Sequence, residues 1–350
     1  MSYLDPRGGP PTSGDRSSSD EPAPYAAYWV PGDEKETPPA EVGPAWNAPT
    51  AATSTSAAEF ALTAGQHAGG HRRADGETQV KSRAGRNLPA AIAVGVSLCL
   101  IVFASLTLWP PAFLGVIAVA SGVGIWEMTR ALRVTGAHPP LIPLLAGGLL
   151  MSGLAWFSGE DAVVLGLVVT VLAAVLWRLA DRPKELRQDF TASLLISIYV
   201  PFLLSFGILL SVPDDGAMRV LCTLLAVVLS DTGGYAAGVF FGKHAMAPAI
   251  SPKKSWEGFA GSVTAAAIGS SLLLYFLLDV PFYWGLLFGA VISVVAVIGD
   301  LGESMLKRDL GIKDMSQLLP GHGGLMDRLD SILFAVPAAY LLLTLISPPG

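Results

Sequence analysis

The last third of the sequence contains four clusters of polar residues between long apolar runs. They read SDTGGY (230–235), ISPKKSWEG (250–258), GDLGESMLKRD (299–309) and PGHGGLMDRLDS (320–331). Carboxylates are the ligands that Mg²⁺ prefers, and lysines and glycine-rich turns bind phosphate groups. The clusters therefore point to chemistry on phosphates.

The first cluster places Asp231 inside an apolar run. An aspartate in a membrane helix costs about 2.5 to 3.5 kcal/mol on insertion scales, so it commonly faces a cavity, a metal or a cation. Gly233 and Gly234 would let the backbone approach a ligand closely. The alternative is that Asp231 lies near the membrane interface and is hydrated.

The second cluster places Lys253 and Lys254 in a compact basic turn before a helix that we expect to start near Trp256. A helix amino terminus beside lysines attracts phosphate through its free N–H groups and its dipole. An ordinary positively charged loop is the alternative.

In the third cluster, four polar residues recur at spacings of three or four and therefore share one helix face. They are Asp300, Glu303, Ser304 and Lys307. With Arg308 and Lys313 close behind, this stripe could hold a divalent cation and the phosphates that it neutralises. The alternative is the hydrated end of a membrane helix.

In the fourth cluster, glycines make the backbone around His322 permissive, and Asp327, Asp330 and Ser331 follow on one helix face. Glycine N–H groups can bind phosphate oxygens. The alternative is that Asp327 pairs only with Arg328. Together the four clusters suit phosphoryl or nucleotidyl transfer to a lipid at the cytoplasmic leaflet.

The composition describes the elements that must position these residues. Of 350 residues, 52% are hydrophobic and 14% are charged, against roughly 25% charged in ordinary soluble domains. Cys99 and Cys222 lie in apolar runs, where we expect no disulfide.

Residues 1–87 are rich in Pro, Gly, Ser, Thr and Ala, and we predict a disordered cytoplasmic tail. Its patch PYAAYWVPG (24–32) is a docking motif or an inert segment.

Continuously apolar runs fill residues 88–350. They are 88–109, 111–128, 141–158, 162–178, 191–212, 217–239, 257–278, 281–305 and 326–346. Most approach the roughly 20 residues that a helix needs to cross a membrane, and their apolarity does not alternate as in a β-barrel. We therefore predict an all-α, polytopic integral membrane protein with about nine transmembrane helices and its active-site motifs in 230–331.

The charges between the runs separate into two sets. One set of links carries Arg130, Arg133, Arg178, Arg182, Lys184, Arg187, Lys243, Lys253, Lys254, Lys307, Arg308 and Lys313, and the other carries Glu160, Asp161, Asp214, Asp215 and Asp279. Arg219 is the one basic residue near an outer end. Basic links lie on the cytoplasmic side. We therefore expect a cell-membrane protein with its tail and active site in the cytoplasm and its carboxyl terminus on the opposite side.

The segment SMLKRDLGIKDMSQLLPGHGGLMDRLDS resembles the signature of the phosphatidate cytidylyltransferase, or CDP-diacylglycerol synthase, family. The matching positions are Ser304, Lys307, Arg308, Lys313, Asp314, Ser316, Pro320, His322, Gly323, Gly324, Asp327, Arg328 and Asp330. SDTGGY and ISPKKSWEG are also similar to family motifs, with Ser255 where threonine is common. The resemblance covers roughly residues 88–350.

This resemblance implies a membrane enzyme, often dimeric, that joins CTP to phosphatidic acid with Mg²⁺, giving CDP-diacylglycerol and pyrophosphate. It implies Asp300 and Asp327 as metal ligands and leaves open whether potassium shares that site. The expected catalytic residues are Lys307, Arg308, Lys313, Asp314, His322, Arg328 and Asp330. The expected substrate-binding residues are Asp231, Lys253, Lys254, Ser304, Gly323 and Gly324.

Two other functions remain open at this point. A CTP-dependent lipid kinase needs similar groups but transfers the γ-phosphoryl. An ion-coupled transporter would use Asp231 and Asp300, although such sites usually lie near the midplane between repeated halves, and no repeat is visible. We expect no nucleic-acid partner.

Overall fold

The computed structural model describes residues 88–181, 186–318 and 323–348, with side chains from residue 94 onward. The predicted disordered tail, its patch at 24–32 and His322 lie outside these residues. The described helices are α1 (Leu88–Leu108), α2 (Pro111–Leu132), η1 (Arg133–Thr135), α3 (Leu141–Phe157), α4 (Glu160–Ala180), α5 (Leu186–Ser197), η2 (Ile198–Phe202), α6 (Leu203–Ser211), α7 (Gly216–Phe241), α8 (Trp256–Leu278), α9 (Phe282–Asp309) and α10 (Met326–Ile346).

The helices follow the apolar runs of the sequence. Seven helical stretches of the described residues are long and apolar enough to span a membrane, and two shorter apolar helices cover Val94–Leu108 and Leu141–Phe157. Each of the nine runs corresponds to one of these stretches. The prediction of a helical, multi-pass membrane protein is therefore confirmed, and both cysteines are free as expected.

The stretch Leu186–Ser211 is the most enclosed of the seven spans. Its middle, η2, is a π-helical segment with Pro201 inside it. Proline has no N–H to donate to the helix ladder, which favours a local change in helical winding. The result is one continuous span made of α5, η2 and α6.

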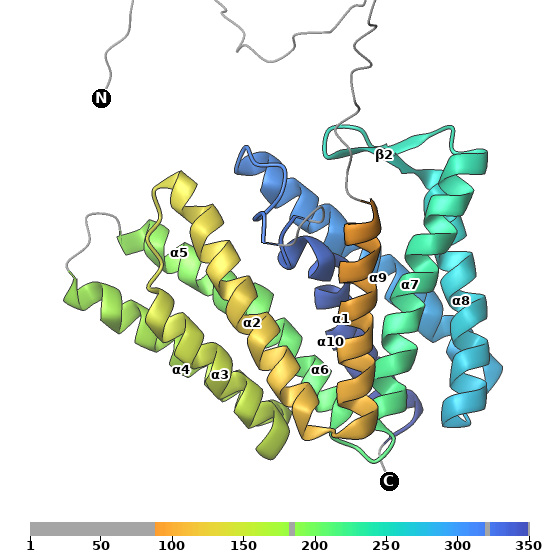
Figure 1. The fold of residues 1–350 in the computed structure, drawn as a ribbon, viewed down its shortest axis with the longest axis horizontal. Helices are drawn as coiled ribbons and strands as arrows, with labels where there is room; N and C mark the ends of the chain where they lie inside the picture. Colours follow the sequence, from red (N-terminus) through yellow and green to blue (C-terminus); the bar gives the residue numbers. More distant parts are fainter. Residues whose placement is uncertain (1–87, 182–185, 319–322, 349–350) are drawn as a thin grey trace, which may run out of the picture. The chain divides into compact units, whose positions relative to one another are not determined.

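The helices pack in two groups that share a central pair. Figure 1 shows α2, α3, α4 and α5 on one side, α7, α8 and α9 on the other, and α6 and α10 between them. Fully buried side chains such as Leu274, Phe288 and Ile292 fill the second group. The central α10 contacts α9, α7, α6 and α2, so its first turn can receive side chains from several elements.

Glycines bring α7 and α8 close together. A Cβ atom at Gly233 would lie 2.7 Å from the Gly261 carbonyl oxygen, and one at Gly261 would lie 2.8 Å from the Gly233 carbonyl oxygen. Gly234 likewise faces Ser262. Gly233 and Gly234 therefore allow close packing of α7 against α8; the ligand approach expected from the sequence stays a prediction.

A small hairpin joins α7 to α8 and was not expected from the sequence. Its antiparallel strands are β1 (Ala245–Ala247) and β2 (Ser251–Ser255). Helix α8 then starts at Trp256, as predicted, and the Ser255 side chain caps it by accepting a hydrogen bond from the Gly258 N–H (3.1 Å). The hairpin lies at the end of α7 opposite the carboxyl-terminal end of α10 (Figure 1).

Candidate active site

The predicted polar stripe of α9 forms one face of that helix. The Lys307 ammonium donates to Glu303 Oε1 at 3.1 Å, and Ser304 Oγ lies 3.5 Å from Asp300 Oδ1. Both pairs are four residues apart, which places them one above the other on a helix. The expectation that these four residues share a face is confirmed.

The first turn of α10 brings Asp327 to the same lysine. Lys307 Nζ lies 2.9 Å from Asp327 Oδ1. The other oxygen of Asp327 accepts the N–H groups of Met315 (2.9 Å) and Gly324 (2.8 Å). The Gly324 N–H, which the sequence offered for phosphate, is thus directed at Asp327 in this structure, and Asp327 ties the preceding turn to α10.

The hairpin contributes a second lysine. Lys254 forms an ion pair with Asp300, and Arg308 Nε lies 3.5 Å from the Ile250 carbonyl oxygen. These contacts join β2 and the preceding turn to the end of α9. Lys253 is exposed on the same strand. The second and third sequence clusters therefore meet at one place, as a shared phosphate site requires.

Two further aspartates approach this group. Asp330 interacts electrostatically with Asp300 and Asp231, and its Oδ1 accepts the Ser331 N–H at 2.7 Å. The site thus contains five carboxylates and two ammonium groups, belonging to Asp231, Asp300, Glu303, Asp327, Asp330, Lys254 and Lys307. Negative charge exceeds positive charge among these side chains, so the group can accept a further cation.

A metal ion fits this donor set. Within the described residues, no three histidine, cysteine, aspartate or glutamate side chains are grouped to hold a metal. Mg²⁺, however, often takes only one or two protein carboxylates and completes its shell with water and phosphate oxygens. Glu303 Oε2 is buried without a hydrogen-bond partner in the described part of the chain. The orphaned oxygen and the excess negative charge both fit a divalent cation.

The other predicted residues surround this centre. Lys313, Asp314 and Arg328 are exposed between and beside α9 and α10. Gly323 has φ +83°, and a Cβ atom there would lie 2.8 Å from Asp327 Oδ2. A side chain would be strained there and would also crowd the carboxylate, so glycine suits this position.

The sequence analysis missed a further buried carboxylate, which lies beside the five carboxylates of the site. Glu127 of α2 is 0% exposed, and it accepts hydrogen bonds from Ser316 and from the start of α10. A carboxylate in an apolar run was the signal that drew attention to Asp231. The same signal could have identified Glu127, but Arg130 and Arg133 follow it and make it resemble an ordinary helix end.

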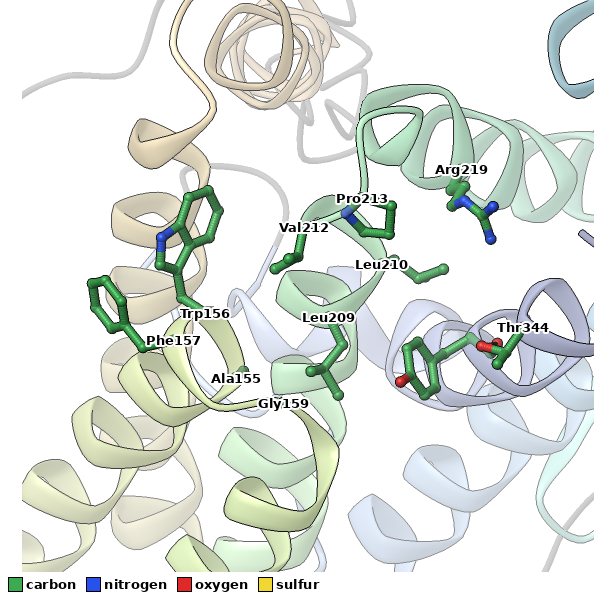
Figure 2. A pocket seen from close by; sticks show the side chains of 11 residues that line it. Ala155, Trp156, Phe157, Gly159, Leu209, Leu210, Val212, Pro213, Arg219 and Thr344 are labelled. Atoms are coloured by element: carbon green, nitrogen blue, oxygen red, sulfur yellow. Dashed lines mark hydrogen bonds between the residues drawn. The ribbon is translucent and has the colours of Figure 1, made fainter. Parts of the chain in front are cut away.

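A cavity of about 310 Å³ lies away from these residues. Figure 2 shows its wall, which includes Trp156, Leu209, Arg219 and Thr344. Arg219 lies in the first turn of α7 and Thr344 in the last turn of α10, so the cavity is at the opposite ends of the helices that carry Asp231 and Asp327. The Arg219 guanidinium already donates to Asp215 and to the backbone carbonyls of Leu343, in the last turn of α10, and Ser347, which follows it.

Comparison with known proteins connects this arrangement to a family. Residues 89–346 match the Cytidylyltransferase family. A phosphatidate cytidylyltransferase of Mycobacterium bovis is 44% identical over 278 residues, which cover 76% of this chain and 91% of that protein. One from Mycobacterium leprae is 43% identical over 285 residues (77% and 91%). One from Staphylococcus haemolyticus is 30% identical over 259 residues (74% and 98%).

Proposed function

The chain belongs to the cytidylyltransferase family, and from this premise we propose that it is a membrane phosphatidate cytidylyltransferase that condenses CTP with phosphatidic acid to give CDP-diacylglycerol and pyrophosphate. The observation that carries the proposal is the meeting of carboxylates and lysines from α7, β2, α9 and α10 inside the matched region. This meeting point is at one end of membrane helices. A dissolved nucleotide and a membrane lipid can both reach such a position.

The chemistry needs charge compensation more than proton transfer. The phosphate of phosphatidic acid is a monoester with a second pKa near 6, so it is largely dianionic at neutral pH. One of its oxygens attacks the α-phosphorus of CTP, a new P–O bond forms, and pyrophosphate leaves with the electrons of the broken bond. Because the nucleophile is already ionised, the protein must mainly overcome repulsion between anions and align them.

The basic residues of the site take this role. Lys254 and Lys307 lie among the carboxylates, and Lys253 and Arg308 are exposed beside them. We assign these four to the phosphates of the substrates. His322, outside the described residues, is assigned to phosphate contact in preference to proton transfer. Asp231 would orient a cation or the cytidine end of CTP.

We assign Asp300 and Asp327 to hold Mg²⁺, with K⁺ as a candidate second ion. Both carboxylates carry lysine partners, and the excess negative charge around them supports a cation there. When bound, Mg²⁺ would supply positive charge that offsets the charge on the transferring phosphate and the departing pyrophosphate. The remaining work, which is binding and aligning the substrates, falls to the side chains described above.

The proposal extends to location and assembly. Basic links support a cell-membrane orientation with the tail and the active site in the cytoplasm, where CTP is available, and with the carboxyl terminus on the opposite side. The resemblance of the sequence to an often dimeric family supports a homodimer. We propose no nucleic-acid partner for this protein.

A labelled-substrate assay tests the reaction directly. The purified full-length protein in detergent receives phosphatidic acid, Mg²⁺ and CTP labelled at the α-phosphate. We expect the label to move into the lipid fraction, because the CMP moiety is transferred. A chelator should abolish this transfer and added Mg²⁺ should restore it.

Other results would contradict the proposal. Label that stays in CDP while a lipid alcohol gains phosphate would identify a kinase. Solute flux without CTP consumption would identify a transporter. Full activity in the presence of chelator would remove the metal from the mechanism but not the transfer of CMP.

A further inference from the structure

Glu127 is a buried carboxylate that the reaction scheme above does not use. It lies near the end of α2, in a segment that also buries Ile125 and Met128, and its own side chain is 0% exposed. Burying a charged carboxylate is costly unless hydrogen bonds or opposite charges compensate it. The contacts of Glu127 therefore indicate what the residue is for.

Within the described residues, Glu127 accepts three hydrogen bonds, and all of them come from the segment that precedes and begins α10. Oε1 accepts from Ser316 Oγ at 2.6 Å and from the Leu325 N–H at 2.9 Å, and Oε2 accepts from the Met326 N–H at 2.8 Å. The first N–H groups of a helix have no partner within the helix. In the part of the chain that the structure describes, the N-cap residue Leu325 makes no side-chain cap hydrogen bond. Glu127 caps this end from another helix, where a negative charge is also favoured by the helix dipole.

Asp327 holds the same turn from the other side. It accepts from Met315 N–H and Gly324 N–H through Oδ2 and from Lys307 through Oδ1. A Cβ atom at Gly324 would lie 2.8 Å from both Glu127 carboxylate oxygens. The two carboxylates thus bind neighbouring N–H groups of one backbone segment, Gly324 through Asp327 and Leu325 and Met326 through Glu127.

We propose that Glu127 is a positioning residue, which fixes the backbone before α10 and thereby the place of Asp327 at the proposed metal site and of its partner Lys307 at the substrate phosphates. Glu127 does not itself touch the substrates. The inference rests on the proposed cytidylyltransferase function. A carboxylate suits the role because its oxygens accept from all three donors. In glutamine, the amide nitrogen would bring a donor to one of the N–H groups or to the Ser316 hydroxyl.

The test compares Glu127→Gln with the wild-type enzyme in the labelled-CTP assay. Misalignment of reacting groups can cost up to about 100-fold in rate, so we expect kcat to fall about 10- to 100-fold while the KM for CTP changes less than about threefold. The matched control is Glu160→Gln. Glu160 also accepts an interhelical hydrogen bond, from the Tyr340 hydroxyl (2.6 Å), but at the opposite end of α10. This control should keep kcat within about twofold.

A second comparison separates positioning from general stability. In an Asp327→Asn background, Glu127→Gln should reduce kcat less than about twofold further, because residues that act through one another are not additive. A full second loss of 10- to 100-fold would show that Glu127 acts independently of Asp327 and would overturn the inference. So would wild-type kcat in Glu127→Gln itself.

If Glu127→Gln does not fold, Ser316→Ala decides the question. It removes one of the three hydrogen bonds and leaves the carboxylate in place, so we expect a folded protein with kcat reduced about 3- to 10-fold. Wild-type kcat in that variant would reject the inference. A wild-type protein that forms no CDP-diacylglycerol would instead reject the proposed function, so the two failures are distinguishable.

Discussion

At the scale of single residues, the site pairs each proposed metal carboxylate with a lysine from a different element. Asp300 of α9 meets Lys254 of β2, and Asp327 of α10 meets Lys307 of α9. The lysines hold in place carboxylates that would otherwise repel one another. Because these ammonium groups lie beside the proposed metal carboxylates, they could also bind substrate phosphates that a Mg²⁺ ion holds there.

Replacing Asp300 with asparagine removes the charge of the side chain and keeps its shape, so it tests whether the charge is needed for turnover. We expect Asp300→Asn to lower turnover at least ~100-fold, as does loss of other charge-stabilising groups, and to leave the thermal midpoint nearly unchanged because the side chain is 32% exposed. The control is Asp309→Asn, an exposed carboxylate at the end of the same helix. Turnover by Asp300→Asn close to that of the control would remove Asp300 from the metal site.

Asp327→Asn should behave differently from Asp300→Asn. A similar loss of turnover is expected, but Asp327 also accepts two backbone N–H groups. Weakening those bonds should lower the free energy of unfolding by about 1 to 3 kcal/mol. Chemical denaturation of both variants in the same detergent measures this difference. Equal stability of the two variants would show that the backbone contacts of Asp327 contribute little.

At the scale of elements, the sequence predicted the membrane helices, because their positions depend on the length and apolarity of each run. The apolar runs indicated the described helices closely, and the start of α8 at Trp256 was predicted from the preceding turn. The hairpin was missed because β1 and β2 have three and five residues, too few for an alternating pattern. The π-helical η2 was missed because its only local signal is Pro201, which is also compatible with a kink.

Contacts between distant elements could not be predicted from spacing. Glu127 binds Ser316 and Met326, which lie 189 and 199 residues further along the chain. Within its own run, Glu127 resembles a hydrated helix end. The polar stripe of α9 was predicted because its partners are four residues apart, whereas the cap of α10 by α2 depends on how the helices pack.

The contact between α7 and α8 gives a prediction at this scale. At Gly261, an added methyl group would meet the backbone of Gly233, two residues after Asp231. Overpacking of this kind costs about 1 to 3 kcal/mol, so Gly261→Ala should lower the thermal midpoint. Gly153→Ala on α3, where a Cβ atom meets nothing within 4 Å, should leave it unchanged or raise it slightly. Equal midpoints would show that α7 and α8 can separate at no cost.

At the scale of the whole molecule, the position of the site and the charges of the links should indicate the same side of the membrane. The clustered carboxylates and lysines lie where the hairpin, the end of α9 and the start of α10 meet. The basic links containing Arg133 and Arg187 belong to the same set as these residues, and the acidic link with Asp161 belongs to the other. CTP is strongly charged and does not cross a membrane unaided, so the site must face the compartment that contains it.

Cysteine labelling in intact cells tests this orientation. Asp161→Cys should react with a membrane-impermeant maleimide from outside, whereas Arg133→Cys should react only after permeabilisation, because basic links remain in the cytoplasm. Both positions are exposed. Cys222 is buried, and the exposed Cys99 of α1 is replaced with alanine in both variants so that it adds no background. The reverse labelling pattern would place the carboxylate site outside the cell, away from CTP, and would contradict the cytoplasmic assignment.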